Sequence, residues 1–164
     1  MRPTPITPQP GQESVWDYPR PARWEDTPKR IKVVFNDVVI AETQRAKRVI
    51  ETSHPPSYYV PPEDIRFEYL TETTHRTFCE WKGMARYYTV VANGKEAANA
   101  VWCFPKPTAN FVSIKDYCCF YVRSMDACYV DDELAMPQPG QFYGGWITKD
   151  IVGPFKGEPG TMGW

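Results

Sequence analysis

The fold class is decided by the stretch Met84-Ala-Arg-Tyr-Tyr-Thr-Val-Val-Ala-Asn-Gly-Lys-Glu-Ala-Ala-Asn-Ala-Val-Trp-Cys-Phe104. Its two halves, 84–91 and 97–104, are rich in aromatic and β-branched residues, which favour strands. The dipeptide Asn93-Gly94 lies between them and is typical of the tight turn of a two-residue hairpin. The stretch therefore predicts two antiparallel strands.

Strand patterns continue on both sides of this hairpin. Further strands are expected at 31–35, 38–42, 46–52, 57–60, 77–81, 117–122, 127–130 and 133–136. Asn36-Asp37 and Asp131-Asp132 are the expected turns of two more hairpins. Pro55-Pro56 is expected to break the chain before 57–60. The segment 117–122 is apolar on both faces, which predicts a central strand covered on both sides.

One short helix is expected over 61–70, because Pro61-Pro62-Glu63-Asp64 puts proline and acidic residues in its first turn. The chain has 17 Pro and 10 Gly, which favours turns over long helices. The expected fold is thus mostly β: one compact β-barrel-like domain of about eight or nine strands with one short helix.

Composition excludes several classes of function. The net charge is −1 and neither half of the chain is basic, so no nucleic-acid partner is expected. The densest basic spot, Arg45, Lys47 and Arg48, is interpreted as a solvated strand edge. The longest apolar run, 117–122, is far shorter than the ~20 residues that span a bilayer, and no secretory signal is visible, so a cytoplasmic protein without a membrane partner is expected.

The five cysteines are Cys79, Cys103, Cys118, Cys119 and Cys128. Their number is odd and no C-x-x-C occurs, so the sequence predicts neither a disulfide framework nor a metal site. Cys118 and Cys119 should face opposite sides of a strand. Buried, inert thiols are expected for at least four of the five, and no cofactor is expected.

Three regions organise the chain. Residues 1–12 contain four prolines and predict a disordered tail. The rest, 13–164, is expected to form the single β domain. Within it, 13–30 is an extended aromatic arm whose rings pack on the sheet, and 140–164 is a tail of glycines and aromatic residues that wraps over the domain.

Five motifs give the chain a family resemblance: Ser14-Val-Trp-Asp-Tyr-Pro-Arg20, Cys79-Glu-Trp-Lys-Gly83, Asp126-Ala-Cys-Tyr-Val-Asp131, Gln141-Phe-Tyr-Gly-Gly-Trp146 and Val152-Gly-Pro-Phe-Lys-Gly157. The chain resembles the bacterial domain-of-unknown-function family 427. The resemblance implies a compact β fold related to the β-tent group and no established activity. Some relatives carry a nucleotidyltransferase label, but that chemistry needs a Gly-Ser turn followed by Asp-x-Asp, and this sequence has neither.

Cys79, Glu51 and Lys82 are the candidate catalytic residues. A nucleophilic cysteine needs a nearby cation or histidine, and Lys82 and His54 are the candidates near in sequence. Glu51 ends a strand and can act as a general base in a cleft. The alternatives are a buried core cysteine, a surface salt bridge of Glu51, and a solvated turn lysine.

Ligand contacts are expected on two segments, 51–59 and 79–82, together with aromatic residues of the central strands. The expected ligand-binding residues are Glu51, His54, Tyr58, Tyr59, Glu80, Trp81, Tyr87 and Trp102. The rings could form an aromatic cage, although core packing explains most such rings without a ligand.

The leading hypothesis is a metal-independent small-molecule-binding domain, which could also be an enzyme. An alternative is a protein-interaction module that uses the N-terminal proline-rich and aromatic arm to bind a protein partner. A second alternative is a thiol-based redox role of Cys79.

Overall fold

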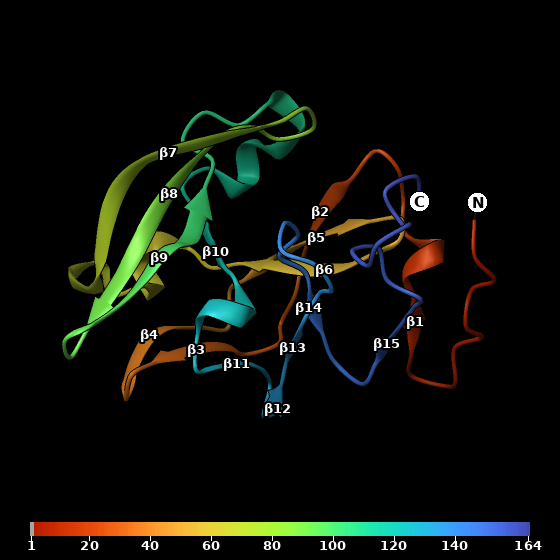
Figure 1. The fold of residues 1–164 in the computed structure, drawn as a ribbon, viewed down its shortest axis with the longest axis horizontal. Helices are drawn as coiled ribbons and strands as arrows, with labels where there is room; N and C mark the ends of the chain where they lie inside the picture. The colour runs from red at the N-terminus through yellow and green to blue at the C-terminus, as the bar shows by residue number, and fades with distance from the viewer. Residues whose placement is uncertain (1) are drawn as a thin grey trace.

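The computed structural model describes residues 2–164, which form β-strands and short 3-10 helices (Figure 1). The strands are β1 (Glu13–Ser14), β2 (Arg23–Asp26), β3 (Ile31–Phe35), β4 (Val38–Thr43), β5 (Lys47–Glu51), β6 (His54–Tyr59), β7 (Leu70–Cys79), β8 (Gly83–Ala92), β9 (Lys95–Cys103), β10 (Cys118–Phe120), β11 (Ala127–Val130), β12 (Glu133–Leu134), β13 (Met136–Pro137), β14 (Trp146–Ile147) and β15 (Ile151–Val152). The 3-10 helices are η1 (Val15–Asp17), η2 (Pro62–Asp64), η3 (Phe67–Tyr69), η4 (Ala109–Ile114) and η5 (Val122–Ser124). Among these residues, no helix is long and apolar enough to cross a membrane.

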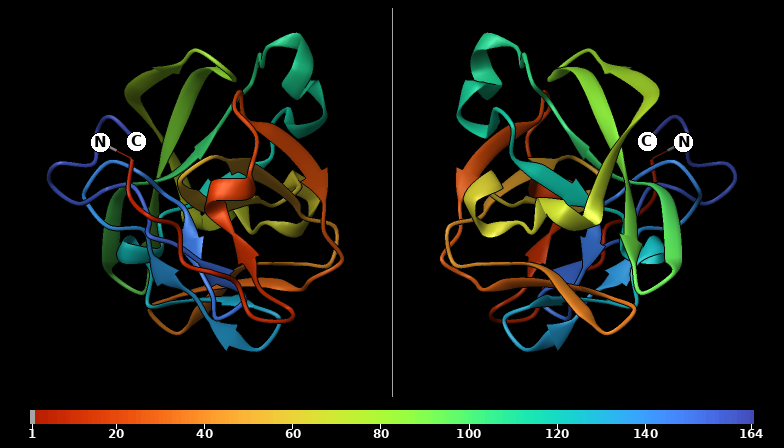
Figure 2. Two further views of the ribbon diagram at one scale, coloured as in Figure 1. Left: turned by 90° about the vertical axis from the view of Figure 1, so that its right-hand side faces the viewer. Right: turned by 90° about the vertical axis from the view of Figure 1, so that its left-hand side faces the viewer.

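The strands pair into five open sheets. Two have four strands, in the orders β10-β9-β8-β7 and β12-β11-β3-β4, one has three, β2-β5-β6, and the pairs β1-β15 and β13-β14 complete the set. In the views of Figure 2, the sheet with β7 to β9 (green) and the strands β3 and β4 (orange) lie on different sides of the molecule, and Asn36 and Asn93 join the tips of their hairpins by hydrogen bonds. The mostly β character is confirmed. Within residues 2–164 the sheets do not close into the expected barrel, because outer strands such as β7, which pairs with β8 alone, end each sheet.

Three hairpins form where the turn residues predict them, and in one of them Asp131-Asp132 joins β11 to β12. Asn36 and Asp37 both have positive φ, 46° and 68°, and join β3 to β4. Asn93 and Gly94, with φ of 50° and 83°, join β8 to β9. Positive φ at both central residues is the type I′ turn, whose twist matches that of the flanking strands.

The expected helix over 61–70 is wrong. This segment forms η2 and η3, two single 3-10 turns, and Leu70 already begins β7. The extended Ile65 separates the turns, with φ −117° and ψ 136°. Its bridge to Ala41 explains the interruption, because a residue that pairs with a strand cannot continue a helix.

Two further expectations differ from the structure. Pro55 and Pro56 do not break the chain but lie inside β6, which tolerates them because β6 is the outer strand of its sheet and has a register shift beside them. The segment 117–122 forms only the three-residue edge strand β10. The three residues of β10 are nevertheless buried. On the side of β10 that faces away from β9, Val60 and Cys118 exchange two backbone hydrogen bonds.

Three hydrophobic clusters hold the sheets together. The largest joins residues of β3, β4, β6, β8 to β11 and β14 around Tyr58 and Trp146. A second lies under one face of β8 and β9 and contains Tyr59, Trp102 and Cys119. Cys118 belongs to the first cluster and Cys119 to the second, so the two adjacent thiols do face opposite ways.

The third cluster joins the two ends of the chain. Trp16 packs edge-on against Trp164, with the ring centroids 5.7 Å apart, and its Nε1 donates to the carbonyl of Pro154. Residues 2–12 have no regular secondary structure, but Ile6 N donates to Gly153 O, and Gln12 Nε2 donates to Lys149 O. The N-terminal segment thus lies along the C-terminal one.

Candidate functional site

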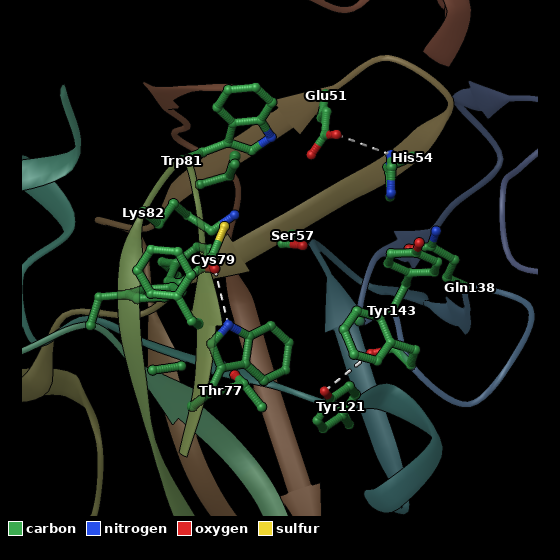
Figure 3. A pocket seen from close by; sticks show the side chains of 18 of the residues that line it. Glu51, His54, Ser57, Thr77, Cys79, Trp81, Lys82, Tyr121, Gln138 and Tyr143 are labelled. Atoms are coloured by element: carbon green, nitrogen blue, oxygen red, sulfur yellow. Dashed lines mark hydrogen bonds and ion pairs between the residues drawn. The ribbon is translucent and has the colours of Figure 1, made fainter. Parts of the chain in front are cut away.

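A partly open pocket of about 290 Å³ lies between β6, the β7–β8 end and the C-terminal segment. In Figure 3, Cys79, Trp81 and Lys82 lie on one side of it and His54, Gln138 and Tyr143 on the other. The volume is near the lower end of the range for small-molecule sites, roughly 300–1,000 Å³. The lining combines aromatic rings with acidic, basic, thiol and amide groups.

The floor of the pocket is aromatic and rigid. Trp102 Nε1 donates to the hydroxyl of Tyr59 at 3.0 Å, and the Trp102 ring lies 4.5 Å from that of Tyr121. Tyr59 is 1% exposed, and this burial raises its pKa well above the ordinary value. Tyr87 exchanges a 2.9 Å hydrogen bond with Thr77 across β7 and β8. The floor therefore offers flat apolar faces held in one arrangement.

Glu51 and His54 form an acid–base corner at the β5–β6 turn. The His54 Nδ1 lies 3.0 Å from the carbonyl of Thr52 and 3.9 Å from Glu51 Oε2. Since a carbonyl only accepts, Nδ1 carries the proton and Nε2 is left as an acceptor. Burial lowers the pKa of His54, opposed by the charge of Glu51, so the ring is neutral near pH 7.

The aromatic arm contributes to this corner through Arg20. Its Nε lies 3.8 Å from Glu51 Oε2, and its NH2 donates to the carbonyl of Thr52 at 2.7 Å. The β5–β6 turn is thereby bound to the N-terminal segment, and the charge of Glu51 is partly balanced by a cation outside the pocket lining.

Cys79, Trp81 and Lys82 form the opposite corner, where β7 ends and the chain turns into β8. Thr108 holds this turn, because its hydroxyl donates to the Trp81 carbonyl at 2.6 Å and its N–H donates to the Lys82 carbonyl at 3.1 Å. Cys79 is partly buried, whereas the other four cysteines are buried, and all five are free. The Lys82 ammonium lies 5.7 Å from the ring centroid of Phe104.

The third wall comes from the C-terminal segment. Gln138 is 3% exposed and bridges two loops, since its Oε1 accepts from Gly145 N at 3.0 Å and its Nε2 donates to Lys156 O at 2.8 Å. Tyr143 packs edge-on against His54 at 4.9 Å, and the Lys156 ammonium lies 5.5 Å from the Tyr143 ring. This wall is built by contacts between residues far apart in the chain.

The structure brings most of the predicted site residues together. The pocket lining includes Glu51, His54, Tyr59, Cys79, Glu80, Trp81, Lys82, Tyr87 and Trp102. Tyr58 is the exception: its ring lies on the opposite side of β6 in the main core, 5.4 Å from that of Trp146. Its inclusion was wrong because neighbouring strand residues point to opposite faces.

Sequence reasoning missed Ser57, Thr77, Gln138, Tyr143 and Lys156, which also line the pocket. Alternation along β6 and β7 signals the first two, because Ser57 is two residues from Tyr59 and Thr77 is two residues from Cys79. No local signal marks the three C-terminal residues.

Other candidate features have structural explanations. Arg45 pairs with Asp64, Lys47 with Asp26, and Arg48 with Glu13 and Glu25. These residues lie on or just before β5, which is the central strand of its sheet rather than the expected edge. Within residues 2–164, no three His, Cys, Asp or Glu side chains are grouped closely enough to hold a metal ion.

A family comparison agrees with the motifs. The model of the family described as "Domain of unknown function (DUF427)" matches residues 23–131, more than half of the chain. The chain belongs to this family. The DUF427 match includes the acid–base corner and the Cys79–Lys82 corner, while Gln138, Tyr143 and Lys156 follow it. No curated protein matches the chain.

Proposed function

We propose that this protein binds a small organic molecule without a metal ion, in the pocket between the Glu51–Tyr59 and Cys79–Lys82 segments. The observation that carries the proposal is the convergence of segments far apart in the chain on one partly open pocket with an aromatic floor and polar corners. Apolar pockets with a few convergent polar groups are the usual form of ligand sites.

The chemistry of the lining indicates how a ligand is held. The Tyr59–Trp102–Tyr121 group supplies faces for a flat or apolar body, and the hydrogen bond between Tyr59 and Trp102 keeps them in position. The neutral His54 offers an acceptor at Nε2, which suits a hydroxyl or amide donor of the ligand. If the ligand is also converted, His54 is the residue to take a proton from it.

The surroundings of the N-terminal arm favour this proposal over a protein-interaction module. Trp16 and Tyr18 are 7% and 9% exposed, and both rings lie in the protein's own core. Both rings pack against other residues of the chain and neither lines the pocket, whereas Tyr59 and Trp102 do. A redox role of Cys79 is less favoured, because the pocket lining contains no second cysteine with which Cys79 could form a disulfide.

A thermal-shift screen of small aromatic and aliphatic metabolites tests the proposal. A binder should raise the melting temperature of the wild type, and Glu51→Ala and Trp81→Ala should each reduce that rise. Glu96→Ala, at an exposed position outside the pocket, is the matched control and should leave the rise unchanged. The proposal fails if no compound stabilises the wild type, or if both pocket variants respond as the control does.

A further inference from the structure

Charge is distributed unequally between the two sides of the pocket. On the side of the β5–β6 turn, Glu51 is the carboxylate, and Arg20 and His54 lie within 4 Å of it. On the opposite side, Lys82 stands among the aromatic rings of Phe104 and Phe111, at 5.7 Å and 5.8 Å from their centroids. The Glu51 carboxylate is thus partly balanced by Arg20, whereas Lys82 forms no ion pair among residues 2–164, although Glu80 also lines its side of the pocket.

The ammonium of Lys82 has no carboxylate partner among the residues that the structure describes. Among residues 2–164 it forms no ion pair and no hydrogen bond, and its neighbour Glu80 is exposed and lies beyond ion-pair distance. The other lysine of the lining, Lys156, donates to the carbonyl of Trp164 at 3.4 Å. The rings of Phe104 and Phe111 attract the Lys82 ammonium but accept none of its three N–H donors in an ordinary hydrogen bond, so these donors are available to an acceptor on a ligand.

We propose that the ligand carries a carboxylate on a flat apolar body, and that Lys82 binds this carboxylate while the Tyr59–Trp102–Tyr121 group contacts the body. This inference rests on the function proposed above and narrows it to a ligand class. A carboxylate is favoured over a phosphate because this side of the pocket supplies a single cation, whereas phosphate sites usually add arginine forks or a helix N-terminus.

The size of the pocket agrees with such a ligand. Its volume of about 290 Å³ equals that of roughly ten water molecules at ~30 Å³ each. One aromatic ring with a short carboxylate side chain fits within this space. The opposite side then meets the ligand with His54 Nε2, which can accept a hydrogen bond from a polar substituent on the ring.

Three probes of one shape test the role of charge: phenylacetate, phenylacetamide and phenethylamine. Binding to the intact protein is measured by NMR chemical-shift titration. We expect phenylacetate to bind at least tenfold more tightly than phenylacetamide, and phenethylamine to bind most weakly, because the Lys82 ammonium attracts the full charge of a carboxylate, meets only a partial charge on an amide oxygen, and repels a second ammonium.

The variants assign the effect to Lys82. Lys82→Met keeps the aliphatic stem and should weaken phenylacetate about tenfold while changing phenylacetamide less than twofold. Lys82→Arg should retain most of the preference. Lys106→Met, at an exposed position nearby, is the control and should change neither.

The outcomes separate this inference from the proposed function. If the three probes bind equally well, or if Lys82→Met and Lys106→Met behave alike, the carboxylate assignment is overturned while small-molecule binding stands. If no probe binds and the metabolite screen is also empty, both are overturned. A preference for phenylacetate that Lys82→Met abolishes supports both.

Discussion

Gln138 should contribute more to stability than any other polar side chain of the pocket. It is 3% exposed and bridges two loops: Oε1 accepts from the N–H of Gly145, and Nε2 donates to the carbonyl of Lys156. Gln138→Leu keeps the approximate size of the side chain and removes both hydrogen bonds. The C-terminal wall should then lose its connection between the 138–145 loop and the segment at Lys156.

The expected cost follows from what the substitution leaves unpaired. Gly145 is buried, so its N–H loses its partner without access to water, which costs about 1–3 kcal/mol. Lys156 is only partly buried, so its carbonyl can regain a hydrogen bond from water and costs about 1 kcal/mol or less. Together, the free energy of unfolding should fall by about 1–4 kcal/mol.

Urea denaturation followed by circular dichroism measures this loss. Gln141→Leu is the matched control, since Gln141 lies exposed in the same loop, and it should change the free energy of unfolding by less than about 0.5 kcal/mol. A loss below 0.5 kcal/mol for Gln138→Leu would refute the reasoning that its two hydrogen bonds hold the wall.

Three further outcomes are expected. Cys79 should be the one thiol that iodoacetamide labels quickly in the native protein, because the other four are buried; Cys79→Ser should abolish this labelling, and rapid labelling of a second thiol would contradict the account. Burial lowers the pKa of His54 below its unfolded value of 6.5, so the unfolded state binds that proton more tightly and stability should fall as pH drops from about 6.5 to 5; His54→Gln should flatten urea-measured stability in this window, and an unchanged slope would count against it. Gly157→Ala should lower the free energy of unfolding by about 2–4 kcal/mol, since φ is 141° and the added Cβ would overlap the Pro139 carbonyl oxygen; Gly163→Ala, which meets open space, is the control, and equal stability of the two variants would contradict the close approach.

The central strands could be predicted because their signals are local. Asn36-Asp37 and Asn93-Gly94 force positive φ at a two-residue turn, and the flanking segments carry strand-forming residues. β7 was predicted only over its last residues, because its first part, 70–76, is largely polar and exposed and has no apolar period to detect. For Pro55 and Pro56 the sequence predicts a break where the structure has a strand. The two prolines are compatible with β6 because β6 is the outer strand of its sheet.

The residues of the candidate site likewise fall into two groups, those that the sequence predicts and those that it does not. Glu51, His54, Cys79 and Lys82 lie on short segments with an unusual concentration of reactive side chains, so residue type alone selected them. Gln138 and its neighbours reach the pocket only through the packing of the C-terminal segment against β6. That packing depends on contacts between residues far apart in the chain, such as the bond from Gln138 to Lys156.

The most direct test of ligand binding in this pocket uses the indole N–H signals of the six tryptophans. Trp81 and Trp102 line the pocket, whereas the indoles of Trp16 and Trp146 donate to the carbonyls of Pro154 and Phe120 away from it. Adding phenylacetate to the ¹⁵N-labelled protein should shift the signals of Trp81 and Trp102 and leave those of Trp16 and Trp146 in place. Stationary Trp81 and Trp102 signals, or shifts centred on Trp16, would contradict the account.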